Sequence, residues 1–300
     1  MRGPQDPPTL EQFAAQRPAA GPCSVALCLG PLELELGGLD EARAALLFER
    51  YSPYASAAAR STHALRLRLG LEPVDYFLDP PTEVEHVQVR IACDGARVRY
   101  LSYQIAGWFD VRGGRGDLLL ARGDWEPPWR SFENYIRTAV AWQAAGRGGA
   151  LVHAASAVRA GRGYLFYGES GAGKSTLCAC NRRGQVLSDD LSLVLPGAAG
   201  LEIVGSPFRG TYEGAPAVQG RFPLAAGFRL IQAPRAEVRA VDRVRALAEL
   251  VGNLPFVAES FHERPDLFGA TLDGFAGVPL AHLRFTKDDG FWDAIQAAGL

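Results

Sequence analysis

The chain carries the segment Gly168-Glu169-Ser170-Gly171-Ala172-Gly173-Lys174-Ser175, which matches the pattern Gly-x-x-x-x-Gly-Lys-Ser/Thr of a phosphate-binding loop. Glycines let successive backbone N–H groups approach an anion without a Cβ in the way, the lysine can reach the outer phosphates, and the serine hydroxyl can bind Mg²⁺. The sequence therefore predicts that this segment, together with Thr176, binds a nucleoside triphosphate, ATP or GTP.

The residues around this loop predict a strand before it and a helix after it. Residues 163–167 form an aromatic and aliphatic run typical of a buried strand, and residues 175–180 open a helix whose N-terminus points at the phosphates. Arg182 and Arg183 follow the helix, where cations complement its dipole, so we interpret them as capping residues, the alternative being contacts to a ligand. A second apolar run, 151–158, precedes the first by so short a turn that an antiparallel hairpin is expected.

Two adjacent carboxylates, Asp189 and Asp190, follow Ser188 and stand directly before the apolar run 191–195. An Asp-Asp pair is usually a solvated turn. At a strand end shortly after the phosphate-loop helix, however, the pair offers what Mg²⁺ binding and activation of a hydroxyl both require. We therefore predict a functional role for both aspartates.

These motifs, with His153 fifteen residues before Gly168, resemble the catalytic domain of HPr kinase/phosphorylase and its kinase-like relatives, which are structurally allied to phosphoenolpyruvate carboxykinase. The resemblance covers roughly residues 130–300 and rests on three motifs in matching order. It implies an α/β fold with a P-loop-containing HPr kinase/phosphoenolpyruvate carboxykinase-like core.

The same resemblance implies roles for individual residues. The segment from Gly168 to Thr176, with Lys174, would hold the β- and γ-phosphates of ATP, and Ser175 would bind Mg²⁺. Asp189 and Asp190 would divide metal binding and general-base duty, and which aspartate takes which role stays open. His153 would lie beside the acceptor, where it tunes the protonation of the aspartates or contacts phosphate; the alternative is a core histidine.

The chain also departs from the bifunctional enzymes. Thr176 stands where they carry an acidic residue, and their Arg-Gly-Leu-Gly signature is replaced by Ser206-Pro207-Phe208-Arg209-Gly210-Thr211. Arg209 is the candidate for a guanidinium that stabilises charge on the transferred phosphoryl group, the alternative being an exposed loop arginine. The departures leave phosphorylase activity, and HPr as the acceptor, without support. The sequence is closer to the diverse HPr-kinase-like proteins, some of which accompany peptide-modification systems.

Composition limits the class of protein. A net charge of −2 argues against a nucleic-acid-binding surface, and no apolar stretch is long enough for a signal peptide or a membrane span. Five cysteines form no Cys-x-x-Cys pair, so we expect reduced thiols. These features predict a cytoplasmic protein with no nucleic-acid or membrane partner, and a homo-oligomer stays open.

At 300 residues the chain is long enough for two domains. We predict a disordered tail over 1–20, a small α+β domain of unknown role over 21–130, and the P-loop catalytic domain over 131–300. In the first domain the sequence predicts a helix over 41–51 and a hairpin at Asp94-Gly95.

Two further helices are predicted in the catalytic domain. The first, over 131–145, would bridge the two domains. The second, over 238–251, would bury an apolar face made of Val241, Val244, Leu247 and Val251.

The sequence thus predicts an ATP- and Mg²⁺-dependent kinase whose acceptor is a hydroxyl, with serine of a protein or peptide as the first choice. A small-molecule hydroxyl is an alternative acceptor. The alternative from another class is a nucleotide-binding switch or ATPase that moves the N-terminal domain. The Asp pair favours the kinase, and a transporter-type ATPase is disfavoured because the chain has neither a Leu-Ser-Gly-Gly signature nor an Asp-Glu ending of a Walker B strand.

Overall fold

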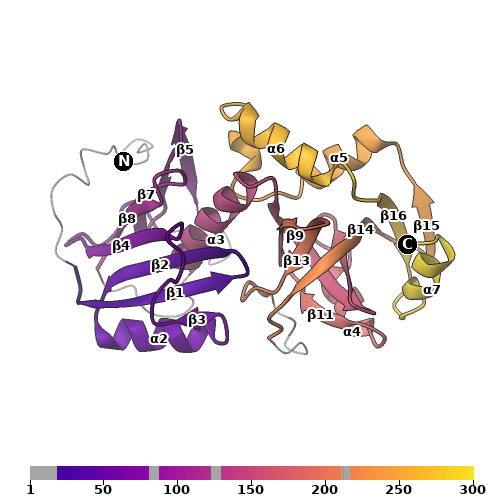
Figure 1. The fold of residues 1–300 in the computed structure, drawn as a ribbon, viewed down its shortest axis with the longest axis horizontal. Helices are drawn as coiled ribbons and strands as arrows, with labels where there is room; N and C mark the ends of the chain where they lie inside the picture. Colours follow the sequence, from indigo (N-terminus) through magenta and orange to yellow (C-terminus); the bar gives the residue numbers. More distant parts are fainter. Residues whose placement is uncertain (1–18, 81–87, 123–129, 211, 213–216) are drawn as a thin grey trace. The chain divides into compact units, whose positions relative to one another are not determined.

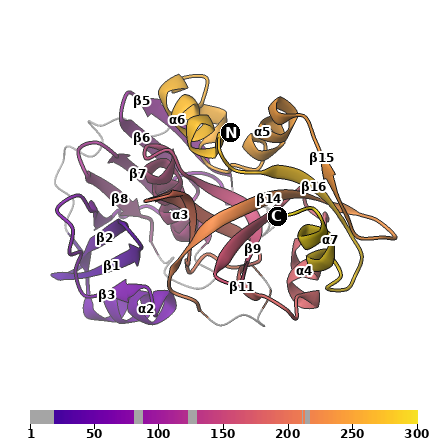
Figure 2. The ribbon, with the colours of Figure 1, turned by 45° about the vertical axis from the view of Figure 1, so that its right-hand side comes forward.

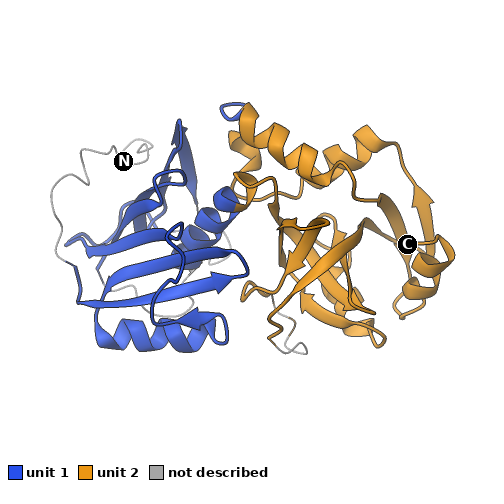
Figure 3. Cartoon of the chain, viewed as in Figure 1, with its two compact units in different colours: residues 1–143, 262–264 blue, residues 144–261, 265–300 orange. Residues whose placement is uncertain are grey.

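The computed structural model describes residues 19–80, 88–122, 130–210, 212 and 217–300. The predicted tail over 1–20 therefore lies outside the described residues except for its last two. The chain divides into two compact units, residues 1–143 with 262–264 and residues 144–261 with 265–300 (Figure 3). The second unit contains residues 168–175, which we call the phosphate loop after the sequence pattern that they match.

The first unit is an eight-stranded sheet in the order β3-β1-β2-β4-β8-β7-β6-β5 (Figure 1). Its strands are β1 (Cys23–Leu29), β2 (Leu32–Leu39), β3 (Ala55–Ser56), β4 (Leu65–Leu71), β5 (Arg90–Asp94), β6 (Arg97–Leu101), β7 (Ile105–Asp110) and β8 (Arg115–Leu120), and its helices are α2 (Glu41–Tyr51) and α3 (Arg130–Ala145). Strands β2, β4 and β8 run parallel to one another and the other pairs are antiparallel, so the sheet is mixed.

Local sequence explains several of these elements. The alternation in β4 buries Leu65, Leu67 and Leu69 while its arginines face solvent. Helix α2 occupies the predicted range 41–51, and the carboxylate of Asp40 caps it by accepting from the N–H of Arg43 at 2.8 Å. The predicted hairpin at Asp94-Gly95 joins β5 to β6.

Helix α3 belongs to the first unit up to Gln143, whereas the sequence assigned it to the catalytic domain. The reason is its packing: the ring of Tyr135 lies so close to Gly107 that a Cβ there would come within 2.5 Å of it. The Tyr135 hydroxyl also donates to the carbonyl of Trp108 at 3.1 Å.

The second unit is a mixed sheet in the order β10-β9-β12-β13-β14-β16-β15, with β11 paired to β9. Its strands are β9 (Ala150–Arg159), β10 (Arg162–Tyr167), β11 (Gln185–Ser188), β12 (Leu191–Gly197), β13 (Gly200–Val204), β14 (Arg221–Gln232), β15 (Glu237–Ala240) and β16 (Leu280–Phe285). Its helices are α4 (Lys174–Cys180), α5 (Arg243–Val251), the 3₁₀ turn η1 (Ala258–Ser260), α6 (Pro265–Phe275) and α7 (Phe291–Ala297). Because β10 also pairs with β14, strands β10, β9, β12, β13 and β14 close into a ring.

The predicted hairpin before the phosphate loop is β9 and β10, whose pairing begins at Arg159 and Arg162. Strand β10 pairs in parallel with β14, and β14 in parallel with β16, so the carboxyl ends of three strands meet beside the loop. The protein is therefore a mixed α/β fold built on two large mixed sheets.

The three parallel strands bury different residues on their two faces. On one face, Phe166 stacks on Phe228 with ring centroids 5.8 Å apart and meets Trp292 of α7 edge-on, in the same core as α4. On the other face, Tyr167, Arg229 and His282 stand in register across the strands, and α5 covers them. Figures 1 and 2 show α5 across the sheet from α4.

The prediction of one helix over 238–251 is wrong. The segment forms β15 and then α5, because β15 pairs with β16 and the carboxylate of Asp242 caps the helix by accepting from the N–H groups of Val244 and Arg245. Val244, predicted to be buried, is 76% exposed, whereas Ala246 and Leu250 are buried.

In the part of the chain that the structure describes, no helix has the length and apolar character that a membrane crossing requires.

Candidate functional site

The phosphate loop connects β10 to α4 and depends on its glycines. Gly168, Gly171 and Gly173 have φ angles of 153°, 80° and 105°, which residues with a Cβ rarely adopt. A Cβ on Gly173 would also lie 2.5 Å from the ring of Phe285. The loop therefore needs glycine at these positions for its own conformation.

Lys174 folds back over the loop. Its Nζ donates to the carbonyl of Gly168 at 2.8 Å and to that of Glu169 at 3.4 Å, and the residue is only 8% exposed. Burial lowers the pKa of Lys174, although the nearby charge of Asp190 acts in the opposite direction.

A cavity of about 520 Å³ opens beside the loop. It is lined by His153, Ser170, Gly171, Gly173, Lys174, Ser175, Thr176, Asp189, Asp190, Gly210, Gln232 and Lys287. The cavity brings together three segments that the sequence singled out: the loop, the Asp pair and His153. Gly168, Glu169 and Ala172 belong to the loop without lining the cavity.

Asp189 is 4% exposed, and both oxygens of its carboxylate accept a hydrogen bond. Oδ1 accepts from the N–H of Gly210 at 2.7 Å and Oδ2 from the N–H of Tyr212 at 2.9 Å. A Cβ on Gly210 would lie 2.7 Å from Oδ2, so this position has no room for a side chain. Asp189 thus fixes the backbone of the neighbouring loop while also lining the cavity.

Asp190 has a different environment from Asp189. Its Oδ1 lies 3.3 Å from Nε2 of His153, and both side chains are partly exposed to the cavity. The two residues meet because β12 pairs antiparallel with β9, with Leu191 opposite His153. The backbone N–H of His153 is held by the carbonyl of Asn253 at 2.8 Å.

Arg209 is half-buried and lines neither this cavity nor the next one described below, although its neighbour Gly210 does. Thr211 lies outside the described residues. Arg183 does not act as the predicted helix cap: its guanidinium pairs with Asp289 and Asp293, next to and within α7, at 3.1 and 2.6 Å.

The sequence did not indicate a second cavity of about 450 Å³ that adjoins the first. It is lined by Gly173, Thr176, Gln232, Ala233, Phe285, Thr286 and Lys287. Gln232 lies at the end of β14, where its side-chain amide donates to the carbonyl of Gly171 at 2.8 Å. One signal was available in the sequence, because Lys287 is one of only two lysines in the chain.

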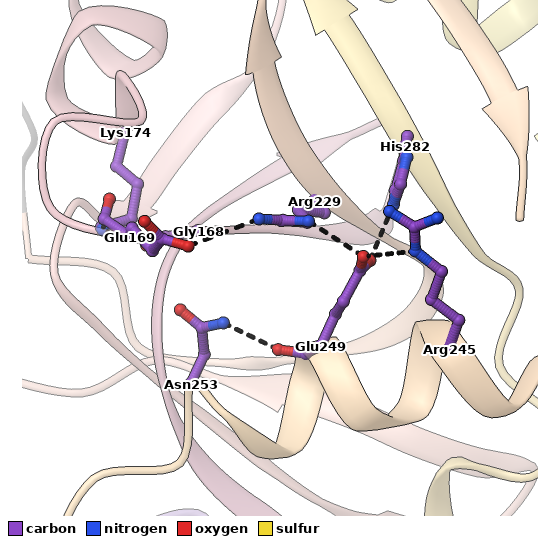
Figure 4. Close-up of polar contacts among 8 residues, drawn as sticks. All are labelled: Gly168, Glu169, Lys174, Arg229, Arg245, Glu249, Asn253 and His282. Atoms are coloured by element: carbon purple, nitrogen blue, oxygen red, sulfur yellow. Dashed lines mark hydrogen bonds and ion pairs between the residues drawn. The ribbon is translucent and has the colours of Figure 1, made fainter.

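A network of polar contacts connects the phosphate loop to helix α5 (Figure 4). Glu249 of α5 is 14% exposed and accepts from Arg229 at 2.9 Å, from Arg245 at 3.0 Å and from His282 at 2.7 Å. Arg229 also reaches Glu169 of the phosphate loop at 3.5 Å. The side chain of Asn253 donates to the carbonyl of Glu249, so α5 is linked both to the loop and to the strand of His153.

Among the described residues, no three His, Cys, Asp or Glu side chains gather closely enough to hold a metal ion by themselves. A metal at this site would depend on Ser175, the aspartates, water and ligand oxygens together, which is the usual situation for Mg²⁺ bound with a nucleotide.

No curated protein matches the chain. The model of the family described as SynChlorMet cassette protein ScmC matches residues 125–298, a range that contains every residue lining the two cavities. Since the match spans more than half of the chain, the protein belongs to the family of SynChlorMet cassette protein ScmC.

Proposed function

We propose that this protein is an ATP-dependent kinase that transfers the γ-phosphoryl group to a hydroxyl, with serine of a protein or peptide as the acceptor. The observation that carries the proposal is that Lys174 of the phosphate loop and the pair of Asp190 and His153 line one cavity. Phosphoryl transfer needs both groups within reach of the same phosphate, because catalysis consists mainly of positioning and charge stabilisation.

The residues present fit ATP and Mg²⁺. The loop has the glycines that allow close approach of an anion, and Lys174 can exchange its carbonyl partners for phosphate oxygens. The 520 Å³ and 450 Å³ cavities each lie within the range of about 300–1,000 Å³ that is typical of ligand sites. Ser175 with Asp189 or Asp190 would hold Mg²⁺, which would neutralise charge developing on the phosphates.

The different environments of Asp189 and Asp190 suggest which of them binds the metal and which is the general base. Asp189 already accepts two backbone hydrogen bonds, so in our proposal it anchors the backbone at Gly210 and Tyr212 and offers a remaining lone pair to the metal. Asp190 faces the cavity and is the general base that accepts the proton of the acceptor hydroxyl. His153 holds the Asp190 carboxylate in place.

We further propose that the second unit has an HPr kinase/phosphoenolpyruvate carboxykinase-like core. The support is the antiparallel hairpin of β9 and β10 that leads into the phosphate loop, and the position of His153 on β9 beside Asp190. The family match itself says nothing of this relationship. The family name describes a cassette protein, so the acceptor is sought first among products of the same cassette.

The proposal is tested by label transfer from γ-³²P-ATP with the variant Asp190→Asn. If Asp190 is the base, the variant retains ATP binding and loses transfer by about two orders of magnitude or more. Asp273→Asn, an exposed change on α6, is the matched control and should behave as wild type. Equal transfer by wild type and Asp190→Asn would show that the carboxylate takes no part in the reaction.

A further inference from the structure

The two lysines of the chain meet at one site. The sequence uses arginine at every other basic position, yet Lys174 and Lys287, which are far apart in the chain, both line the 520 Å³ cavity. Among the residues that the structure describes, no arginine lines it. An ammonium group is a compact point charge on a flexible stem, which suits contact with phosphate oxygens in several arrangements, whereas arginine favours a fixed bidentate geometry.

Lys287 stands where the two cavities join. Four residues line both of them: Gly173, Thr176, Gln232 and Lys287. On one side of this junction lie Lys174 and the aspartates. On the other side lie the buried ring of Phe285 with Ala233 and Thr286, which is an apolar wall with one hydroxyl. A ligand that extends through the junction would be charged at one end and flat or apolar at the other.

The backbone of Lys287 is held in a fixed turn between β16 and α7. The carboxylate of Asp288 accepts from the Thr286 hydroxyl at 2.7 Å and from the N–H of Gly290 at 2.8 Å. Asp289 pairs with Arg183 at 3.1 Å. The two carboxylates that follow Lys287 in the sequence are therefore directed to other partners.

The ammonium of Lys287 has no such partner. Its side chain is exposed, and within the described ranges no hydrogen bond or ion pair joins it to another residue. An unneutralised cation beside a second cation raises the positive potential of the cavity and attracts an anion there.

We propose that Lys287 is a second phosphate-binding cation of this site, which contacts the phosphate nearest the nucleoside while the nucleoside lies in the 450 Å³ cavity. The ligand class is a nucleoside di- or triphosphate. The proposal rests on the proposed function, since it assumes that Lys174 holds the outer phosphates. Lys287 holds a phosphate that is not transferred, so its contact is equally strong before and during transfer. Such uniform binding lowers KM without changing kcat.

The scarcity of lysine provides a direct test in the full chain. The protein is treated with an N-hydroxysuccinimide ester of acetic acid, and the rate of acetylation of each lysine is followed by mass spectrometry. ATP binding is measured separately by calorimetry. ATP should slow acetylation of Lys287 about fivefold or more, because a bound phosphate covers the amine. Inorganic triphosphate should protect it less, because no nucleoside directs that ligand through the junction.

The outcomes separate the two proposals. If calorimetry shows that ATP binds but ATP does not slow the acetylation of Lys287, the proposed role of Lys287 is wrong. The proposed nucleotide site is then not affected. A chain that binds no ATP would overturn the proposed function and the role of Lys287 with it.

Variants give the second measurement. Lys287→Gln should raise the Kd for ATP and for ADP about tenfold and leave kcat within about twofold. The Kd values of Lys287→Arg should lie between those of the wild type and of Lys287→Gln. Arg284→Gln is the matched control, since it removes a positive charge three residues away that lines neither cavity. Equal affinities of Lys287→Gln and Arg284→Gln, or a loss of kcat with unchanged KM, would contradict the assignment.

Discussion

The loop glycines, Lys174 and the two aspartates determine which ligand the 520 Å³ cavity can bind. The glycines of the phosphate loop, Lys174 and the Asp pair could be found from the sequence because their chemistry is local: residue types at fixed short spacing specify them. The different surroundings of Asp189 and Asp190 could not be found in this way. They depend on the backbone N–H groups of Gly210 and Tyr212, which lie 21 and 23 residues further along the chain than Asp189.

Gly210 offers a test of the anchoring role of Asp189. In Gly210→Ala the new methyl group would press against Oδ2 of Asp189, so the carboxylate and the loop must shift. We expect phosphoryl transfer to fall about tenfold or more, since small misplacements in a phosphoryl-transfer site are costly, while ATP affinity by calorimetry stays within about twofold.

Gly269→Ala is the control for this change, because a Cβ there would meet nothing within 4 Å and the residue lies in α6. It should keep full transfer activity. Unchanged transfer in Gly210→Ala as well would mean that the position of Asp189 does not matter to the reaction.

Helices and strands follow the local sequence only where tertiary pairing does not override it. Helix α2 lies where the sequence predicts it, because its Ala- and Leu-rich composition favours a helix and the structure adds a local cap at Asp40. The segment 238–251 was predicted as one helix because its valines recur at helical spacing. Pairing of β15 with β16 and the cap at Asp242 overrode that pattern, and neither can be read from local spacing.

Helix α5 is held to the sheet by charge as well as by apolar packing. Burial raises the pKa of Glu249, but hydrogen bonds from His282 and Arg245, with the charge of Arg229, lower it by more, so the pKa of Glu249 lies below its ordinary value of 4.5. A carboxylate with a lowered pKa stabilises the folded state fully above pH 4.5, and this stabilisation is lost as the pH falls through the lower pKa of the folded chain.

Glu249→Gln should therefore lower the free energy of unfolding at pH 7 by about 1–2 kcal/mol, measured by urea denaturation. The difference from wild type should shrink when the measurement is repeated well below pH 4.5. Glu237→Gln, which breaks an exposed pair with Arg239, should change the free energy by less than about 0.5 kcal/mol. A Glu249→Gln difference that is the same at both pH values would rule out an ionised Glu249 as its source.

For the whole molecule, the prediction of an α/β fold is confirmed at the level of class. The closed ring of strands was not predicted, because it depends on the parallel pairing of β10 with β14, whose residues are separated by more than fifty positions. The same pairing explains why Gln232 and Lys287 were missed as site residues: parallel strands bring their carboxyl ends to the loop only after the sheet has formed.

In our proposal this cavity is where a phosphoryl group passes from ATP to a hydroxyl. Phosphorus NMR of the full chain with ATP and Mg²⁺ tests it directly, with free serine, serine-containing peptides and the products of the same cassette as acceptors. We expect the γ-phosphate signal to be replaced by that of a phosphate ester, inorganic phosphate to form only slowly without acceptor, and Lys174→Ala to abolish the change. Inorganic phosphate as the sole product with every acceptor would point to a nucleotide switch, and an unchanged ATP spectrum would contradict the proposed kinase activity.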